Sequence, residues 1–166
     1  MRKVVHINTC TSEVVDVEAK DYWHDLVDRW EDYKDWLTAG GQELAVHYSK
    51  LAPSSKRGVL PRTRIVALDN PDDAVHFLNE TLVYTNAETM TAVYRVDGVG
   101  TYTMRNYIAV QTIEELEPGK CRITISSHFD ADPEFAEQAE GGTKWFHNMI
   151  ITRGAENSRL LASKAK

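Results

Sequence analysis

The stretch from Asp132 to Leu161 constrains the fold most, because it is the one segment long enough to form a dominant helix. Asp132 is a candidate N-cap, and Pro133 suits the first helical position, where its missing N–H costs nothing. Within this stretch, one helical face collects Phe146, Met149, Ile150, Gly154 and Leu161. Such a face needs an apolar partner, so we expect the helix to lie across a sheet.

Length and composition indicate one globular domain spanning residues 1–166. A chain of 166 residues with 42% apolar and 27% charged residues is large enough to bury a core and shows no sign of disorder. The net charge of −6 opposes binding to phosphates, and we expect no nucleic-acid partner. The composition leaves a homodimer open.

The cysteines and the hydropathy pattern point to a cytoplasmic protein. Cys10 and Cys121 stand far apart, on separate predicted strands, and suggest reduced thiols. No window approaches the 18 or so apolar residues that a membrane span needs, so we expect no transmembrane segment.

Most of the chain between its helical segments has the pattern of strands. Residues Ala19–Trp36 have helical periodicity and predict one bent helix or two short ones. Asp69–Asp72 is a strong turn signal, and Ala52–Pro61 reads as a loop rich in Ser, Pro, Lys and Gly that could move. Strands are expected at Val4–Val15, Leu44–Leu51, Arg62–Leu68, Val75–Thr85, Thr89–Val96, Met104–Leu116 and Cys121–Asp130. This order predicts an α+β fold in which a seven-stranded antiparallel sheet packs on the terminal helix.

Several local sequences resemble the START-like helix-grip superfamily. The resemblance is carried by Val17–Trp36, Thr63-Arg64, Glu80-Thr81-Leu82, Asn106-Tyr107, Ile125–Phe129 and Thr143–Ile150, and it covers nearly the whole chain. That superfamily includes pollen-allergen-like proteins, polyketide cyclases and dehydratases, and plant abscisic-acid receptors. The resemblance implies a curved sheet that grips the C-terminal helix around an apolar cavity. It does not decide between enzymes and passive carriers.

Alternation along the strands nominates residues for the inner face of the sheet. On the fourth strand, Leu78, Glu80, Leu82 and Tyr84 share one face; Ala92 and Tyr94 share a face of the fifth, and Ser127 and Phe129 a face of the seventh. His128 is expected to face water. The sixth strand is ambiguous, and only the resemblance turns Tyr107 inward. With Phe146 and Ile150 from the long helix and Trp36 from the first helical segment, these residues are the candidate ligand-binding wall.

Glu80 is the most informative of these residues, because a buried carboxylate is costly unless it is paired or neutral. Arg64 lies on the neighbouring predicted strand and is the expected partner. Three interpretations stay open for Glu80: a structural ion pair, a polar anchor for a ligand, or a general acid or base.

Other polar residues have both structural and functional interpretations. Tyr84, Tyr94 and Tyr107 could bind a ligand oxygen, although core tyrosines often hydrogen-bond to backbone. His76 and His147 could act as bases, although isolated histidines are usually structural. The six histidines are dispersed and show no metal-ligand spacing, and no nucleotide fingerprint is present, so neither a metal nor another cofactor is expected.

These observations leave three functional hypotheses. The first is an enzyme similar to the polyketide cyclases and dehydratases (a cyclase or lyase), with Arg64, Glu80 and Tyr94 as its catalytic residues. The second is a non-catalytic carrier of a hydrophobic, oxygen-bearing small molecule. The third is a protein-interaction module, which an exposed apolar patch would favour. The resemblance places the enzyme slightly ahead of the carrier.

Overall fold

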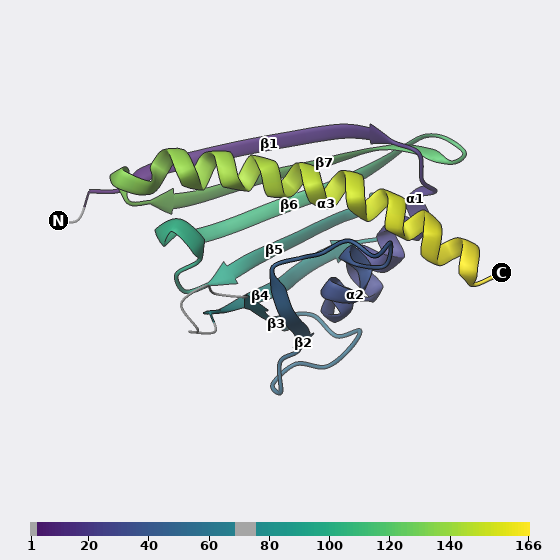
Figure 1. Cartoon of the computed structure of the whole chain (residues 1–166), viewed down its shortest axis with the longest axis horizontal. Coiled ribbons are helices and arrows are strands. Elements are labelled where there is room, and N and C mark those ends of the chain that lie inside the picture. The colour runs from purple at the N-terminus through teal and green to yellow at the C-terminus, as the bar shows by residue number, and fades with distance from the viewer. Residues whose placement is uncertain (1–2, 69–75) are drawn as a thin grey trace.

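The computed structural model describes residues 3–68 and 76–166, which form one curved sheet with a long helix laid across it (Figure 1). The seven strands are antiparallel, in the order β1-β7-β6-β5-β4-β3-β2. In chain order the elements are β1 (Val5–Val15), α1 (Ala19–Trp23), the π-helical η1 (His24–Asp28), the 3-10 turn η2 (Trp30–Asp32), α2 (Tyr33–Leu37), β2 (Val46–Leu51), β3 (Arg62–Leu68), β4 (His76–Asn86), β5 (Thr91–Asp97), η3 (Thr101–Thr103), β6 (Arg105–Glu117), β7 (Lys120–Ala131), η4 (Pro133–Phe135) and α3 (Ala136–Lys164).

This architecture confirms the predicted helix-grip fold and most of its element bounds. The first helical segment, predicted as one bent helix or two short ones, is broken into four short pieces between Ala19 and Leu37. The predicted turn at Asp69–Asp72 lies outside the described residues. No helix in the described part of the chain is both long and apolar enough to cross a membrane.

The start of the long helix differs in detail from the prediction. Asp132 has extended backbone at the N-cap position and Pro133 occupies the first turn, but this turn is 3-10 and α3 itself begins at Ala136. The Asp132 carboxylate does not cap the turn; it pairs with the Arg105 guanidinium, 3.1 Å away. A nearby cation therefore outcompetes the backbone N–H groups for this carboxylate.

The inner face of the sheet is covered in two ways. At one end, α1, α2 and the turns between them lie beneath the last turns of α3 (Figure 1). The contact is close at Gly154, where a Cβ atom would lie 2.6 Å from the Trp36 ring. The Trp36 Nε1 donates hydrogen bonds to the Gly154 carbonyl (3.1 Å) and to Ser158 Oγ (3.0 Å). Over the rest of the inner face, α3 spans the sheet and leaves space below it.

Candidate functional site

A cavity of about 450 Å³ lies between α3 and the strands β2 to β6. Its rim includes two exposed aromatic residues, Trp145 of α3 and Tyr102 of η3, so the cavity has a mouth between the helix and this turn. Most of its wall is apolar, formed by Leu44, Val46, Val66, Leu68, Leu78, Val96, Met104, Phe146, Met149 and Ile150.

Arg64 and Glu80 form a buried ion pair in this wall. The residues are directly opposed on β3 and β4, and the Arg64 Nε and Nη2 atoms each lie 2.6 Å from Glu80 Oε2. The guanidinium carbon lies 3.6 Å from the centre of a Trp30 ring and 4.0 Å from that of Tyr33, and Nη1 donates a 3.0 Å hydrogen bond to the Trp30 carbonyl. The pairing predicted from the sequence is therefore confirmed, and the cation is also held between two aromatic faces.

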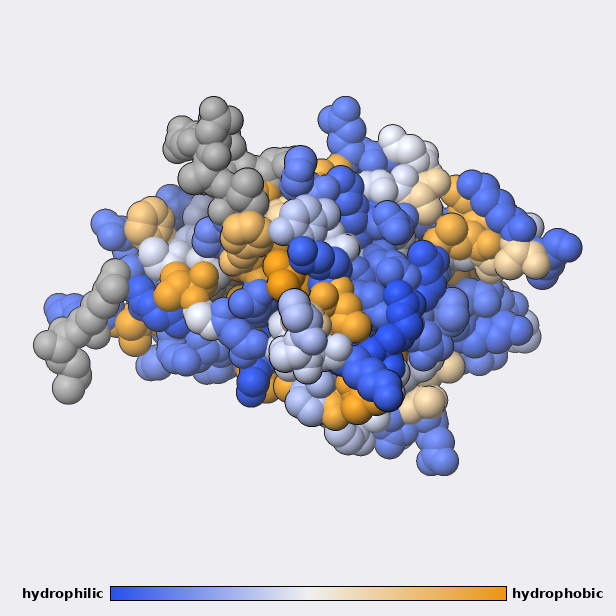
Figure 2. All heavy atoms as spheres, turned by 90° about the horizontal axis from the view of Figure 1, so that it is seen from below, coloured by the Kyte–Doolittle hydropathy of each residue, from blue (hydrophilic) through white to orange (hydrophobic). Residues whose placement is uncertain are grey.

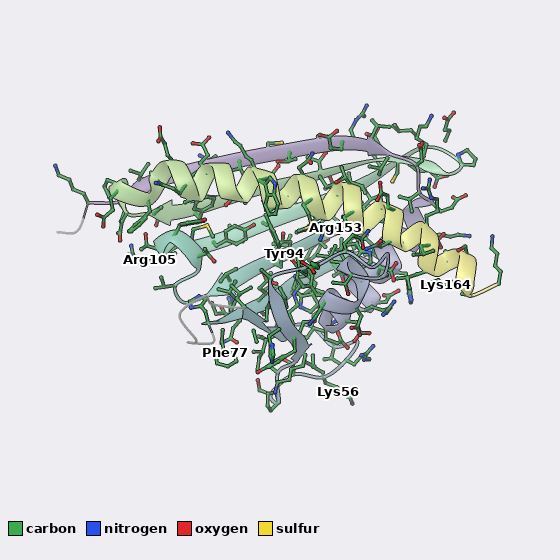
Figure 3. The ribbon with its side chains drawn as sticks, in the orientation of Figure 1. Lys56, Phe77, Tyr94, Arg105, Arg153 and Lys164 are labelled. Atoms are coloured by element: carbon green, nitrogen blue, oxygen red, sulfur yellow. The ribbon has the colours of Figure 1, made fainter. Side chains whose placement is uncertain are left out.

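A second polar group in the wall is a row of three side chains from β5, β6 and α3. The hydroxyl of Tyr107 lies 2.8 Å from His147 Nε2, and the Tyr107 ring packs beside the Tyr94 ring with centroids 6.3 Å apart. All three residues are buried and border the cavity, and Tyr94 lies beneath the middle of α3 (Figure 3). The Nδ1 atom of His147 is buried without a hydrogen-bond partner among the described residues. This row places titratable groups against an otherwise apolar space.

Burial sets the protonation states of this row. Loss of hydration raises the pKa of Tyr94 and of Tyr107 well above the ordinary value for a phenol, and the negative charge of Glu80 adds to the effect. Burial also lowers the pKa of His147 to about 4. At neutral pH the row therefore consists of two neutral phenols and a neutral imidazole, all able to exchange hydrogen bonds with a ligand.

The segment preceding β2 closes one side of the cavity. Glu43, Leu44 and Ala45 border it, and Arg153 of α3 donates a 2.9 Å hydrogen bond to the Glu43 carbonyl (Figure 3). The loop at Ala52–Pro61, which the sequence marked as able to move, is absent from the cavity wall. Its Arg57 pairs with Glu31 at 2.6 Å.

The structure brings together most of the polar residues nominated from the sequence. Arg64, Glu80, Tyr94 and Tyr107 all border the cavity, as do the apolar candidates Leu78, Phe146 and Ile150. The ambiguous strand β6 does turn Tyr107 inward, together with Ala109 and Ile113, while Ile108 faces outward.

The prediction that Tyr84 faces the cavity is wrong, because its side chain is 48% exposed. A β-bulge shifts the β4–β5 register between Leu82 and Tyr84, and a one-residue shift moves the following side chains to the other face. Alternation counted through the strand could not reveal this bulge.

Five further candidates are buried but lie outside the cavity wall, which corrects their assignment as wall residues. Trp36 is fixed between α2 and α3 by its hydrogen bonds to the long helix. Ser127 hydrogen-bonds to Thr9 on β1 at 2.6 Å, and the Phe129 ring stacks on Tyr107 with centroids 5.7 Å apart. Along with these three, the solid part of the core holds Leu82 and Ala92.

Sequence reasoning undervalued two wall residues, Tyr33 and His147. His147 was left open as a base or a structural residue, yet Thr143, His147 and Ile150 follow the same helical period and share the inward face of α3. Tyr33 fits the helical spacing of the first helical segment, but an apolar face does not distinguish a cavity wall from the solid core. The helical period was therefore a usable signal for His147 and marked Tyr33 only as buried.

Solved structures with the same fold include norcoclaurine synthase from Thalictrum flavum. A point mutant of that enzyme in complex with a transition-state analogue has a TM-score of 0.72 and 16% sequence identity, over 99% of both chains. The enzyme in complex with dopamine and hydroxybenzaldehyde also gives a TM-score of 0.72 at 16% identity, over 98% of this chain and 90% of the other. An uncharacterised protein from Bacillus thuringiensis has a TM-score of 0.65 and 18% identity, over 93% and 98% of the two chains.

Sequence comparison alone assigns no family: no family model matches the chain, and no curated protein matches it. At these low identities, the structural likeness shows the helix-grip fold and nothing finer.

We predict that Arg64 and Glu80 are strongly coupled in stability. Replacing one partner leaves the other buried without its counter-charge. Arg64→Met and Glu80→Gln should therefore each lower the free energy of unfolding by about 3–5 kcal/mol. The double variant should lower the free energy of unfolding by much less than the sum of the two single losses. Urea unfolding measures all three. The matched control is the exposed cross-strand pair Arg122–Glu114, at 2.7 Å, whose coupling should stay below about 1 kcal/mol. If the losses in unfolding free energy at Arg64 and Glu80 are additive, the two residues are not coupled.

We also predict that His147 makes stability depend on pH. Its folded pKa of about 4 lies below the value of about 6.5 in the unfolded chain, so the unfolded state takes up a proton first as pH falls. The stability contribution is present above pH 6.5 and is lost between about pH 6.5 and 4, a change of about 3 kcal/mol. Urea unfolding at several pH values should show this loss in the native protein and not in His147→Gln. The exposed His24→Gln should follow the native curve, and parallel curves for all three proteins would contradict the prediction.

Proposed function

We propose that the protein binds a hydrophobic, oxygen-bearing small molecule in its cavity and transfers a proton on it, in a cyclisation or dehydration of the polyketide type. The observation that carries this proposal is the polar row of Tyr94, Tyr107 and His147, placed in the same mainly apolar wall as the Arg64–Glu80 pair. Norcoclaurine synthase, which shares the fold, holds dopamine and hydroxybenzaldehyde, and this supports small-molecule binding by such a scaffold.

The cavity has the size and the lining of a small-molecule site. Its volume of about 450 Å³ falls within the range of about 300–1,000 Å³ that is usual for ligand pockets. Such pockets combine a mainly apolar wall with a few fixed polar groups that orient the ligand. A flexible apolar molecule carrying one or two carbonyl oxygens fits this pattern.

Hydrogen bonds within the row would direct Tyr94 toward a ligand oxygen. His147 Nε2–H can donate to the Tyr107 oxygen. We assign the Tyr107 O–H as a donor to the oxygen of Tyr94, whose ring packs beside it with centroids 6.3 Å apart. The Tyr94 hydroxyl proton is then available to the ligand, and each donated bond behind it strengthens its donation. A carbonyl placed here would gain stabilisation as negative charge develops on its oxygen.

Glu80 is the proposed base. Both short contacts from Arg64 fall on Oε2, so we assign proton removal to Oε1. Oε1 takes a proton from the carbon beside the ligand carbonyl, and Tyr94 donates to the resulting enolate oxygen. In a cyclisation the enolate carbon then attacks a second carbonyl, and the alkoxide that forms takes the proton back from Glu80 Oε1. In a dehydration the enolate expels a β-hydroxyl, which leaves as water with that same proton. Arg64 holds the carboxylate in position.

A non-catalytic carrier is the second candidate function. The observation that favours it is that Arg64, Glu80, Tyr107 and His147 are already paired within the protein, an arrangement that can orient a ligand without reacting with it. A protein-interaction module has less support, because hydrophobic side chains on the face in Figure 2 form small groups separated by hydrophilic ones.

We predict that an apolar fluorescent probe binds the protein saturably and that Leu78→Trp weakens its binding at least tenfold, because the larger ring fills the cavity. Phe77→Trp is the matched control: Phe77 is the next residue of β4, faces outward and is 53% exposed, so its replacement should leave affinity unchanged. Fluorescence titration measures both. If Leu78→Trp folds and binds the probe like the native protein, the cavity is not the binding site.

We predict that Glu80→Gln and Tyr94→Phe lower kcat much more than they weaken substrate binding. Gln keeps the shape of Glu80 but cannot accept the proton, and general acid or base roles typically contribute about 10²–10⁴-fold. Tyr94→Phe should have the smaller effect, and the outward Tyr84→Phe none. Native mass spectrometry of the protein from its own host would give the mass of a retained ligand and guide the choice of substrate. A carrier would show changes in binding alone.

A further inference from the structure

The outer face of the sheet carries a group of three metal-ligating side chains that the cavity does not use. His6 of β1 and His128 and Asp130 of β7 each offer one ligand atom, and these atoms lie within 4.8 Å of one another. His6 is directly opposite Asp130 in the β1–β7 register, and His128 precedes Asp130 by two positions, so all three project from the same side of the sheet. We propose that this group is a binding site for a divalent transition-metal ion of the zinc type.

The ligand set selects the class of metal. Two imidazoles and one carboxylate suit zinc and its neighbours in the first transition row, whereas calcium and magnesium prefer oxygen ligands alone. Zinc–nitrogen and zinc–oxygen bonds are about 2.0–2.2 Å long, so the ligand atoms need only a small approach toward a common centre. The two histidines are exposed and their rings are nearly parallel, with centroids 6.4 Å apart, so rotation of the side chains can bring them together.

Neighbouring amides already hold the ligands as the outer shell of a metal site does. Asn8 Oδ1 lies 2.8 Å from His128 Nδ1 and accepts a hydrogen bond from its N–H, which leaves the Nε2 lone pair for a metal. On the other side, Asn106 Nδ2 donates to Asp130 Oδ2 at 2.8 Å, while the Oδ1 atom of Asp130 contacts His6 Nδ1. Asn106 reaches this position at an irregularity of the β6–β7 ladder, where its φ is 55°. Such irregularities often redirect a side chain beside a functional site.

Binding needs a proton rearrangement in addition to this side-chain rotation. In the metal-free protein, His6 Nδ1–H donates to Asp130 Oδ1. The metal takes the place of this proton between the two atoms, and the imidazole proton moves to Nε2, so the ring stays neutral. Coordination by His6 and Asp130 would then fasten β1, at the edge of the described sheet, to the neighbouring strand β7.

The test is calorimetric titration of zinc into the full chain without an affinity tag, after treatment with a chelator and its removal. We expect one saturable site per chain and a melting temperature that rises with zinc concentration. His128→Gln and Asp130→Asn should each weaken binding at least tenfold, and Asn8→Ala should weaken it about 10–100-fold through the outer shell. Circular dichroism verifies that each variant folds.

Two control variants separate this site from other sources of zinc binding. His24→Gln removes a histidine whose exposed partner Asp28 lies 3.1 Å away, a pair with only two ligands, and should bind zinc like the native protein. Cys10→Ser removes the exposed thiol of β1 and should also change nothing. The proposal is overturned if zinc does not bind saturably, if the ligand variants bind like the native protein, or if Cys10→Ser abolishes binding.

Discussion

The burial of the Arg64 guanidinium is the constraint on which the rest of the site depends. A cation removed from water needs compensation from every side, and here it comes from the Glu80 carboxylate, the Trp30 carbonyl and the faces of two aromatic rings. These partners come from β4 and from the helical segment, so the ion pair ties that segment to the sheet. It thereby fixes the part of the cavity wall that contains Arg64 and Tyr33.

The same polar groups explain why the space under α3 is not filled by collapse. Apolar side chains alone would favour closer packing of helix and sheet. A closer approach would change the hydrogen bond between Tyr107 of β6 and His147 of α3, and a buried polar group that loses its partner costs about 1–3 kcal/mol. The paired groups therefore act as spacers as well as candidate ligand contacts, which joins the stability of the cavity wall to its chemistry.

The success and failure of the sequence predictions follow the regularity of the backbone. Period-two alternation assigned Glu80 and Tyr94 to the inner face, because β3, β4 and β5 are regular up to that point. It failed at Tyr84, just beyond a bulge, since a bulge leaves no mark in the order of apolar and polar residues. Alternation also could not distinguish the solid core around Phe129 from the open cavity. The distance between the helices and the sheet depends on tertiary packing, which the strand pattern does not record.

Strand register explains why sequence spacing did not reveal the group of His6, His128 and Asp130 on the outer face. His6 and Asp130 are 124 positions apart in the chain, yet the β1–β7 pairing places them directly opposite each other. Alternation then keeps this group separate from the cavity, because Phe129, between His128 and Asp130, points to the inner face and stacks on Tyr107. The two sites therefore share no side chain, and β7 is linked to the cavity wall through the Phe129 ring that stacks on Tyr107. A change that moves this strand would be felt on both faces, whereas a side-chain substitution on one face should leave the other unaltered.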